Sequence, residues 1–155
     1  MTSESASRGL EFTPQIRDLI DNSLESGHPV LLAAVGADGQ PILSFRGSAR
    51  TFSDHEIGIW VRKTQGGTLA AIRANPRVAL MYRSQAVPML QFQGLARVVT
   101  DEAARARIFE LSPRREQDAD PDRKGVALLI DVRQVEGVVG FVDDTPQFLR
   151  LAATS

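Results

Sequence analysis

The sequence contains no cysteine, and this absence removes several kinds of chemistry at once. Disulfides, thiolate metal ligands and thiol nucleophiles are all excluded, and a chain without cysteine suits a reducing cytosol. The two histidines, His28 and His55, have no partner at metal-ligand spacing, so we expect no metal site. Any redox chemistry would therefore depend on a bound organic cofactor.

The chain also lacks the features that direct proteins to membranes or nucleic acids. No apolar run approaches transmembrane length, and the first residues, MTSESASRGLEF, lack the charged and apolar regions of a signal peptide. The formal net charge of -1 provides no basic excess for binding a polyanion. We therefore expect a cytoplasmic protein whose partners include neither a membrane nor a nucleic acid.

Sets of catalytic residues are missing as well. Ser53, Asp54 and His55 carry the side chains of a hydrolase triad, but three consecutive residues in a turn cannot form the required relay. We interpret them as turn residues. Asp143 and Asp144 precede a Thr-Pro pair and are interpreted as a second, solvated turn. The sequence therefore offers no catalytic side chain of its own.

The length predicts one domain over residues 1–155, in which the polar residues 1–12 form a loose arm. Thr13 can cap a helix whose first position is Pro14, and apolar residues at helical spacing continue to about residue 26. From Pro29 onward the spacing changes to that of short strands. Within them, the Asp-Gly pair at 38–39 predicts a hairpin turn.

Short apolar runs separated by turns predict a mainly β protein of the α+β type, an antiparallel barrel of six or seven strands with two or three helices. The predicted strands are 30–35, 41–47, 57–62, 77–82, 89–99, 126–132 and 135–142. Gly94 marks a bend or bulge in the longest of the early strands. Residues 101–111 are predicted as a helix capped by Thr100 or Asp101, and residues 112–125 as an exposed loop.

A basic segment stands directly before a short predicted helix that begins near Gly66-Gly67. A helix N-terminus presents unpaired N–H groups and the positive end of the helix dipole, so it stabilises a phosphate. Side chains able to add charge or hydrogen bonds are Arg62, Lys63, Thr64, Gln65 and Thr68. The alternative is an ordinary polar loop in which Thr64 caps the helix and the cations are solvated.

Two predicted strands carry polar residues on one face. Ser44, Arg46 and Ser48 alternate along the second strand, and they would line either a polar ligand groove or a solvent-exposed surface. Gln91 and Gln93 alternate with apolar neighbours in the same way. A sheet edge, an interface or a groove would each explain the two glutamines.

The order of these motifs resembles the pyridoxamine 5'-phosphate oxidase-like family of flavin-binding split barrels. The resemblance covers roughly residues 29–101 and is most specific in TLAAIRANPRVALMY and in the Gly-x-Ala-x-Val pattern at 94–98. It implies a split β-barrel and a homodimer that binds FMN in two equivalent grooves at the subunit interface.

The resemblance also assigns residues to the cofactor. It implies phosphate and ribityl contacts from Arg62, Lys63, Thr64, Gln65 and Thr68. It places Arg46, Gly47 and Ser48 along the flavin ring, with backbone or packing contacts from Trp60 and Val61. Gln65 stands near the place where the family often has a lysine, so a deazaflavin coenzyme is an alternative to FMN.

The resemblance therefore predicts an FMN-dependent oxidoreductase that moves hydride through the flavin ring, acting on a small-molecule substrate that the sequence does not identify. The basic C-terminal pattern expected of a true pyridoxamine phosphate oxidase is not found, so vitamin B6 oxidation is not the expected reaction. Two alternatives stay open. One is a deazaflavin-dependent reductase, and the other is a flavin-binding stress or sensor protein without efficient turnover.

Overall fold

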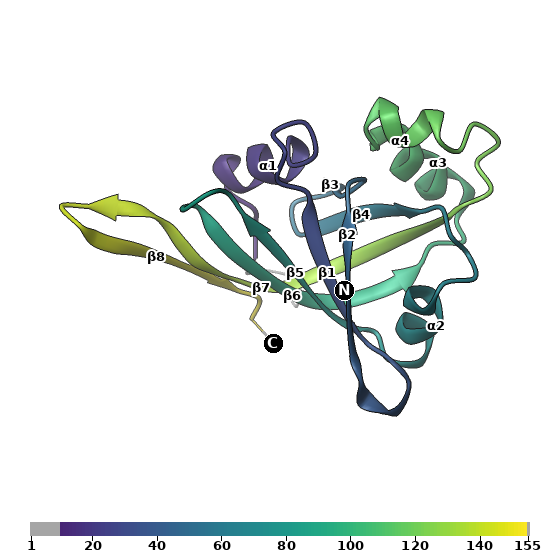
Figure 1. The fold of residues 1–155 in the computed structure, drawn as a ribbon, viewed down its shortest axis with the longest axis horizontal. Helices are drawn as coiled ribbons and strands as arrows, with labels where there is room; N and C mark the ends of the chain where they lie inside the picture. Colours follow the sequence, from purple (N-terminus) through teal and green to yellow (C-terminus); the bar gives the residue numbers. More distant parts are fainter. Residues whose placement is uncertain (1–9, 155) are drawn as a thin grey trace, which may run out of the picture.

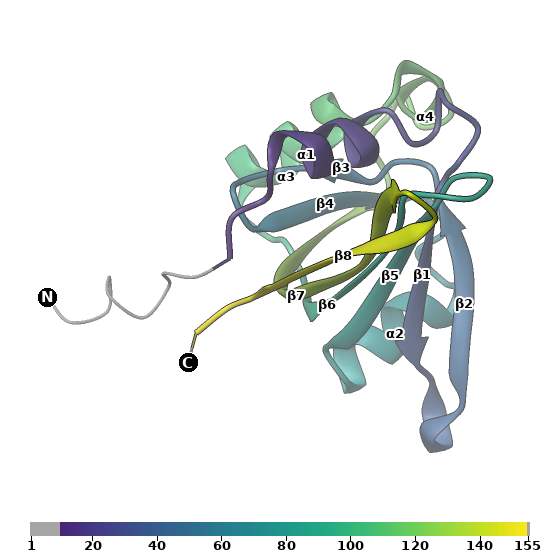
Figure 2. The same ribbon diagram turned by 90° about the vertical axis from the view of Figure 1, so that its left-hand side faces the viewer.

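A computed structural model describes residues 10–154, and Figures 1 and 2 show it from two sides. Within these residues eight antiparallel strands form one strongly curved sheet in the order β2-β1-β5-β6-β7-β4-β3, with β8 paired to β7. The sheet curls into a half-barrel, so the predicted antiparallel split barrel is confirmed. The strands are β1 (Val30–Val35), β2 (Pro41–Arg46), β3 (Arg50–Thr51), β4 (Glu56–Val61), β5 (Arg77–Arg83), β6 (Met89–Val98), β7 (Val126–Val142) and β8 (Thr145–Ala152).

Four α-helices and one short 3-10 turn accompany the sheet in the described residues. They are α1 (Pro14–Asp21), α2 (Gly67–Ala74), α3 (Glu102–Leu111), α4 (Arg114–Asp118) and the 3-10 turn η2 (Ala37–Gly39). The turn connects β1 and β2, and its Asp38 and Gly39 have φ values of 62° and 79°. These are the left-handed conformations that a two-residue hairpin turn requires, so the predicted hairpin is confirmed.

The C-terminal part of the chain differs most from the expectation. The two strands predicted after residue 125 are one strand of 17 residues, β7. The predicted turn at Asp143 and Asp144 is present, with φ values of 48° and 64°, but the chain then returns along β7 as β8. Most residues of β8 are exposed and only Leu149 and Leu151 pack partly against the core, so the sequence offers little apolar alternation from which to predict the strand.

Two helix predictions are also corrected. Residues 112–125 are not an exposed loop throughout, because α4 lies within them and Ser112 is only 4% exposed. The first helix ends at Asp21 rather than near residue 26, and the Asn22 side chain caps it by donating to the Asp18 carbonyl. Turns then continue to Gly27, whose φ of 81° suits glycine.

The concave face of the sheet packs against α1 and α2 in one large apolar core. The Thr13 hydroxyl accepts from the Ile16 N–H at 3.2 Å, as predicted, and this cap directs Ile16 and Ile20 into the core. Leu10 and Phe12 are buried in the same core, so the loose arm does not extend to them. Residues 1–9 lie outside the described part of the chain.

A second apolar cluster fixes the end of β4, where the basic segment begins. It contains Trp60, Val99, Ile108, Phe109, Ala127 and Leu129. Helix α3, capped by the Asp101 side chain as predicted, supplies Phe109, whose ring lies edge-on 5.0 Å from that of Trp60. The Trp60 Nε1–H donates to Asp120 Oδ2 at 2.8 Å, which ties the segment before β7 to β4.

The bulge predicted at Gly94 is confirmed by a register shift between Gln93 and Gly94 in the pairing of β6 with β7. A Cβ added at Gly94 would collide with the Asp131 carbonyl oxygen and lie 3.0 Å from Val132 Cα. The two strands therefore approach too closely for any side chain at this position.

Gly94→Ala is expected to lower the free energy of unfolding by about 1–3 kcal/mol, because the added methyl group forces the strands apart. Urea denaturation measures the loss. Gly140→Ala is the matched control in β7, where an added Cβ meets no atom within 4 Å. Equal losses in the two variants would show that the close approach at Gly94 is not the constraint.

Asp120 makes the stability of this region depend on pH. Burial raises its pKa, but hydrogen bonds from Trp60 and from the N–H groups of Lys124 and Gly125, with Arg105 nearby, outweigh burial and leave the pKa below its ordinary value. A carboxyl group whose pKa is lower in the folded state stabilises the fold above its unfolded pKa of about 3.9, and this contribution is lost as the pH falls through the folded pKa.

Asp120→Asn is therefore expected to cost about 1 kcal/mol at pH 7, the value of one ordinary hydrogen bond at this partly exposed site, and less at pH values well below about 3.9. Denaturant unfolding of both proteins at several pH values measures the difference. A difference that stays constant across this range would contradict a role for the charged carboxylate.

Candidate functional site

A pocket of about 310 Å³ lies among the end of β2, the end of β4, the start of α2 and helix α4. Its lining residues are Phe45, Arg46, Gly47, Ser48, Trp60, Arg62, Lys63, Gly66, Thr68 and Glu116. Seven of the ten predicted site residues are among them: Arg46, Gly47, Ser48, Trp60, Arg62, Lys63 and Thr68. The structure thus places residues 46–48 and residues 60–68, two segments that the resemblance assigned to the same cofactor, around one pocket.

Arg46 connects these two segments. Its Nη2 donates to Thr68 Oγ1 at 2.8 Å, and its Nε donates to Ser44 Oγ at 3.1 Å. The guanidinium is partly buried, and burial lowers the pKa of Arg46, while the charge of Glu116 acts in the opposite direction. Of the two explanations for the polar face of β2, the polar groove is therefore the one the structure supports.

The start of α2 carries no side-chain cap. Gly66 is the N-cap residue, with φ of -78° and ψ of 163°, and no side chain accepts a hydrogen bond from the first turn. The alternative in which Thr64 caps this helix is therefore wrong. A Cβ added at Gly67 would meet no atom within 4 Å, so the space beside the helix start is open. An uncapped helix start of this kind favours an anion.

The predicted residues from 61 to 65 divide among the pocket lining, the exposed turn and the main core. Arg62 is half exposed, and its Nε lies 3.3 Å from Glu116 Oε2. Lys63 is exposed and lines the pocket, whereas Thr64 and Gln65 are exposed and lie outside the lining. Val61 is 1% exposed and belongs to the main core, so it supports the pocket from behind.

Ser48 and Trp60 hold the pocket together through their own contacts. The Ser48 hydroxyl donates to the Trp60 carbonyl and accepts from the Trp60 N–H, each at 3.0 Å. Ser48 is 3% exposed, so its hydroxyl is occupied by the backbone of β4. Both residues therefore position the pocket wall, which is a structural role that the sequence did not indicate.

Three lining residues were not among the predicted site residues. Phe45 precedes Arg46 and is 68% exposed, and Gly66 was predicted only to stand at the start of the helix. Glu116 lies in the segment predicted as an exposed loop, yet only 16% of its side chain is exposed. No pattern in the sequence distinguishes Glu116 from the other charged residues around it.

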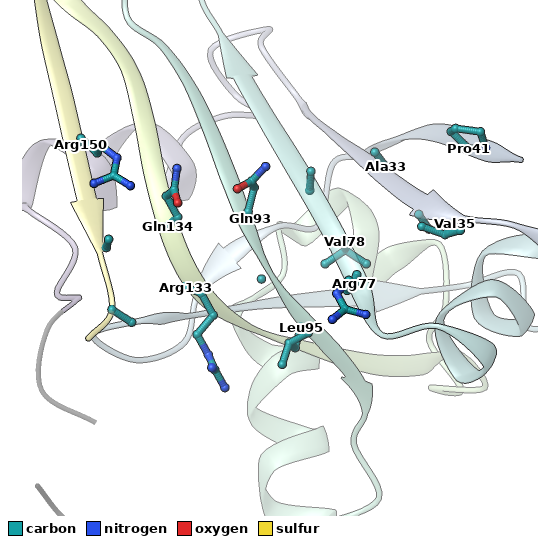
Figure 3. Close-up of a pocket in the computed structure, with 15 residues that line it drawn as sticks. Ala33, Val35, Pro41, Arg77, Val78, Gln93, Leu95, Arg133, Gln134 and Arg150 are labelled. Carbon is teal, nitrogen blue, oxygen red and sulfur yellow. The ribbon is translucent and has the colours of Figure 1, made fainter. Parts of the chain in front are cut away.

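A second, larger groove of about 790 Å³ lies on the outward face of the sheet. Strand register places Leu43, Ala33, Ala79, Gln93 and Gln134 in one row across β2, β1, β5, β6 and β7. Figure 3 shows Gln93, Gln134 and Arg150 on neighbouring strands in this groove. Of the three explanations for the glutamine pair, a groove thus accounts for Gln93.

The side chains excluded from catalysis make other contacts. Ser53 donates to Glu56 at 2.8 Å, Asp54 pairs with Arg17 at 2.6 Å, and His55 pairs with Asp131 at 3.1 Å. The three residues therefore form no triad. In residues 10–154, no group of three His, Cys, Asp or Glu side chains is placed to hold a metal ion, and no helix is long and apolar enough to cross a membrane.

Several solved structures share this fold. HupZ from Group A Streptococcus is 21% identical with a TM-score of 0.62, covering 80% of this chain and 91% of its own. General stress protein 26 from Bacillus anthracis is 18% identical with a TM-score of 0.60, covering 88% and 99%. A Clostridium acetobutylicum protein related to general stress protein 26, of the pyridoxinephosphate oxidase family, is 12% identical with a TM-score of 0.60, covering 86% and 95%. At these identities the likeness shows the fold alone.

Comparison of the sequence with protein families is more specific. No curated protein matches the chain. A family model described as pyridoxamine 5'-phosphate oxidase matches residues 12–146, which extend from just before α1 to the start of β8. This match covers most of the chain and includes every residue that lines the small pocket. The chain therefore belongs to the pyridoxamine 5'-phosphate oxidase-like family of split barrels.

Proposed function

We propose that the chain binds FMN, with the phosphate in the small pocket, and that it is an oxidoreductase acting on a small molecule. One observation carries this proposal: the partly buried Arg46 reaches the first turn of the uncapped helix α2 in a pocket that also contains Arg62 and Lys63. Family membership supports it, because flavin binding is common in this family.

The residues present fit a phosphate group. A partly desolvated guanidinium favours an anionic partner, and Arg46 has further N–H donors besides the two already used. Arg62 and Lys63 add positive charge, and the Thr68 hydroxyl stands beside the helix start. Gly66 and Gly67 leave room for close approach of the ligand to the backbone.

When bound, FMN would supply the hydride chemistry, and the chain would supply position and electrostatics. Arg46, Gly47 and Ser48 form the end of β2 and the wall beside it, where we propose that the flavin ring lies. Trp60 and Val61 keep that wall rigid from behind. Thr64 and Gln65 would contact the ligand only from the exposed turn beside the pocket.

The proposal includes a homodimer that covers the outward face of the sheet. Apolar residues gather on this face at β2, β1 and β5: Leu43, Phe45, Leu31, Ala33, Ala79 and Met81 share it through cross-strand pairing. Leu43 and Phe45 are 70% and 68% exposed in the single chain. Burial of such a patch favours association, and Phe45 also lines the small pocket, which would place the cofactor near the interface.

Two alternatives use the same pocket. A deazaflavin coenzyme also offers a phosphate, and Gln65 in place of the frequent lysine motivates this choice. A flavin-binding stress protein without efficient turnover is motivated by the similar structures named general stress protein 26. The absorption spectrum of the purified protein and its reduction by candidate donors separate these functions, since bound flavin that no donor reduces would favour the stress protein.

Arg62→Ala is expected to weaken FMN binding roughly tenfold, because a charge-assisted hydrogen bond is worth about 1.5–3 kcal/mol. Riboflavin, which lacks the phosphate, should bind wild type and variant equally. Fluorescence titration with both ligands measures the two affinities. Arg73→Ala removes an exposed cation from the last turn of the same helix and serves as the control. Equal losses for FMN and riboflavin would contradict a phosphate contact at Arg62.

Sedimentation velocity is expected to show a dimer at micromolar concentration. Leu43→Glu should shift it toward monomer, because it places a charge in the apolar face that the partner would cover. Gln40→Glu adds the same charge at the exposed end of the β1–β2 turn and should leave the dimer intact. A monomeric wild type would remove the shared-interface part of the proposal.

A further inference from the structure

Glu116 is the only acidic side chain among the described residues that line the small pocket. It comes from α4, and its side chain is 16% exposed, whereas that of Asp118 on the same helix is 68% exposed. One carboxylate of this short helix is thus turned into the pocket and the other toward solvent. A carboxylate removed from water to this extent needs a compensating cation.

The carboxylate of Glu116 stands among the groups proposed to hold the phosphate. Its Oε2 lies 3.3 Å from Arg62 Nε, and its Oε1 lies 3.4 Å from where a Cβ on Gly47 would be. Burial lowers the pKa of Arg46, and the charge of Glu116 offsets part of this effect. Glu116 is therefore ion-paired with Arg62, and its charge also acts on the nearby Arg46, to which it makes no ion pair.

These interactions are replaceable. Glu116 is bound to Arg62 as an ion pair, and its carboxylate accepts no hydrogen bond from any residue between 10 and 154. Helix α4 is anchored by other groups, because the Gln117 amide donates to the carbonyls of Ser112 and Glu110 at 2.8 Å and 3.1 Å. The Glu116 side chain can therefore rotate away while the helix keeps its place.

We propose that Glu116 is an internal competitor for the anion site: its carboxylate neutralises the pocket arginines in the free protein and leaves them when a phosphate group enters. This inference rests on the proposed function in assuming that the pocket receives a phosphate group. A phosphate and a carboxylate carry charge of the same sign, so they cannot share these arginines without mutual repulsion. The pocket consequently binds an isolated phosphate weakly and depends on the rest of the ligand for retention.

The test uses inorganic phosphate as the probe and isothermal titration calorimetry of the full chain. Glu116→Gln keeps the side-chain shape and should bind phosphate about tenfold more tightly than wild type, equivalent to about 1.4 kcal/mol. Asp118→Asn removes the same charge from the exposed side of α4 and should bind like wild type. Unchanged or weaker binding by Glu116→Gln, or an equal gain in Asp118→Asn, would overturn the proposal.

A double-mutant cycle tests whether Glu116 competes with phosphate through Arg62. In an Arg62→Ala background the gain from Glu116→Gln should shrink, because the competition acts largely through that arginine. A gain of the same size in both backgrounds would overturn competition at Arg62.

FMN and riboflavin then separate this inference from the proposed function. FMN should gain from Glu116→Gln as phosphate does, and riboflavin should not. Tighter phosphate binding in a protein that never binds FMN would support Glu116 as competitor and remove the flavin assignment. FMN binding that is equal in wild type and Glu116→Gln would overturn the competitor role and leave the flavin assignment intact.

Discussion

The closure of the curved sheet at residues 47–49 is the constraint on which the pocket depends. Strand β2 lies at one end of the strand order and β3 and β4 lie at the other, and residues 47–49 connect β2 directly to β3 where the curved sheet brings the two ends together. No backbone ladder joins them. The Ser48 hydroxyl both donates to and accepts from the Trp60 backbone, two residues beyond the pairing of Arg50 with Gly58 in the β3–β4 hairpin. The small pocket lies at this place, where β2 and β4 approach each other without strand pairing, and we call it the seam of the barrel.

The side chains assigned to the cofactor converge in this small pocket at the seam. The chain enters the pocket three times, at the end of β2, from the end of β4 to the start of α2, and in α4, and each passage brings polar groups that the sheet does not use. Arg46 joins two of these passages through Thr68. Because α2 begins on a glycine without a side-chain cap, the helix start contributes its N–H groups to the same space. The ability to bind an anion thus depends on the residues at the seam and not on the barrel fold as a whole.

The positive charges of the small pocket are partly balanced by one acidic side chain. Three cations so close together repel one another, and an acidic side chain nearby relieves that repulsion in the free protein. Helix α4 supplies it with Glu116, whose side chain is 16% exposed. A Cβ at Gly47 would lie 3.0 Å from Leu24 and 3.4 Å from Glu116, so the absence of a side chain there lets both approach.

Local chemistry made much of this protein predictable. The Asp-Gly turn, the caps at Thr13 and Asp101 and the bulge at Gly94 each depend on residues adjacent in sequence or on one backbone position, and each was confirmed. Most of the pocket residues were also identified, because they fall in two short segments, 46–48 and 60–68, whose residue types suit a phosphate.

Only the tertiary structure decided the rest. Strand β8 packs only Leu149 and Leu151 partly against the core, and it forms because β7 offers an unpaired edge, which the sequence pattern does not reveal. Ser48 meets Trp60 because the β3–β4 hairpin pairs Arg50 with Gly58. The partner of Arg46, Thr68, lies 22 residues away, and only the tertiary fold brings the two together. The inward direction of Glu116 depends on the packing of a five-residue helix within a stretch that carries many charges of both signs. The sequence determined which groups are available, because propensity and turn chemistry act over a few residues. The curvature of the sheet determined which of those groups meet, because it is a property of all the strands together.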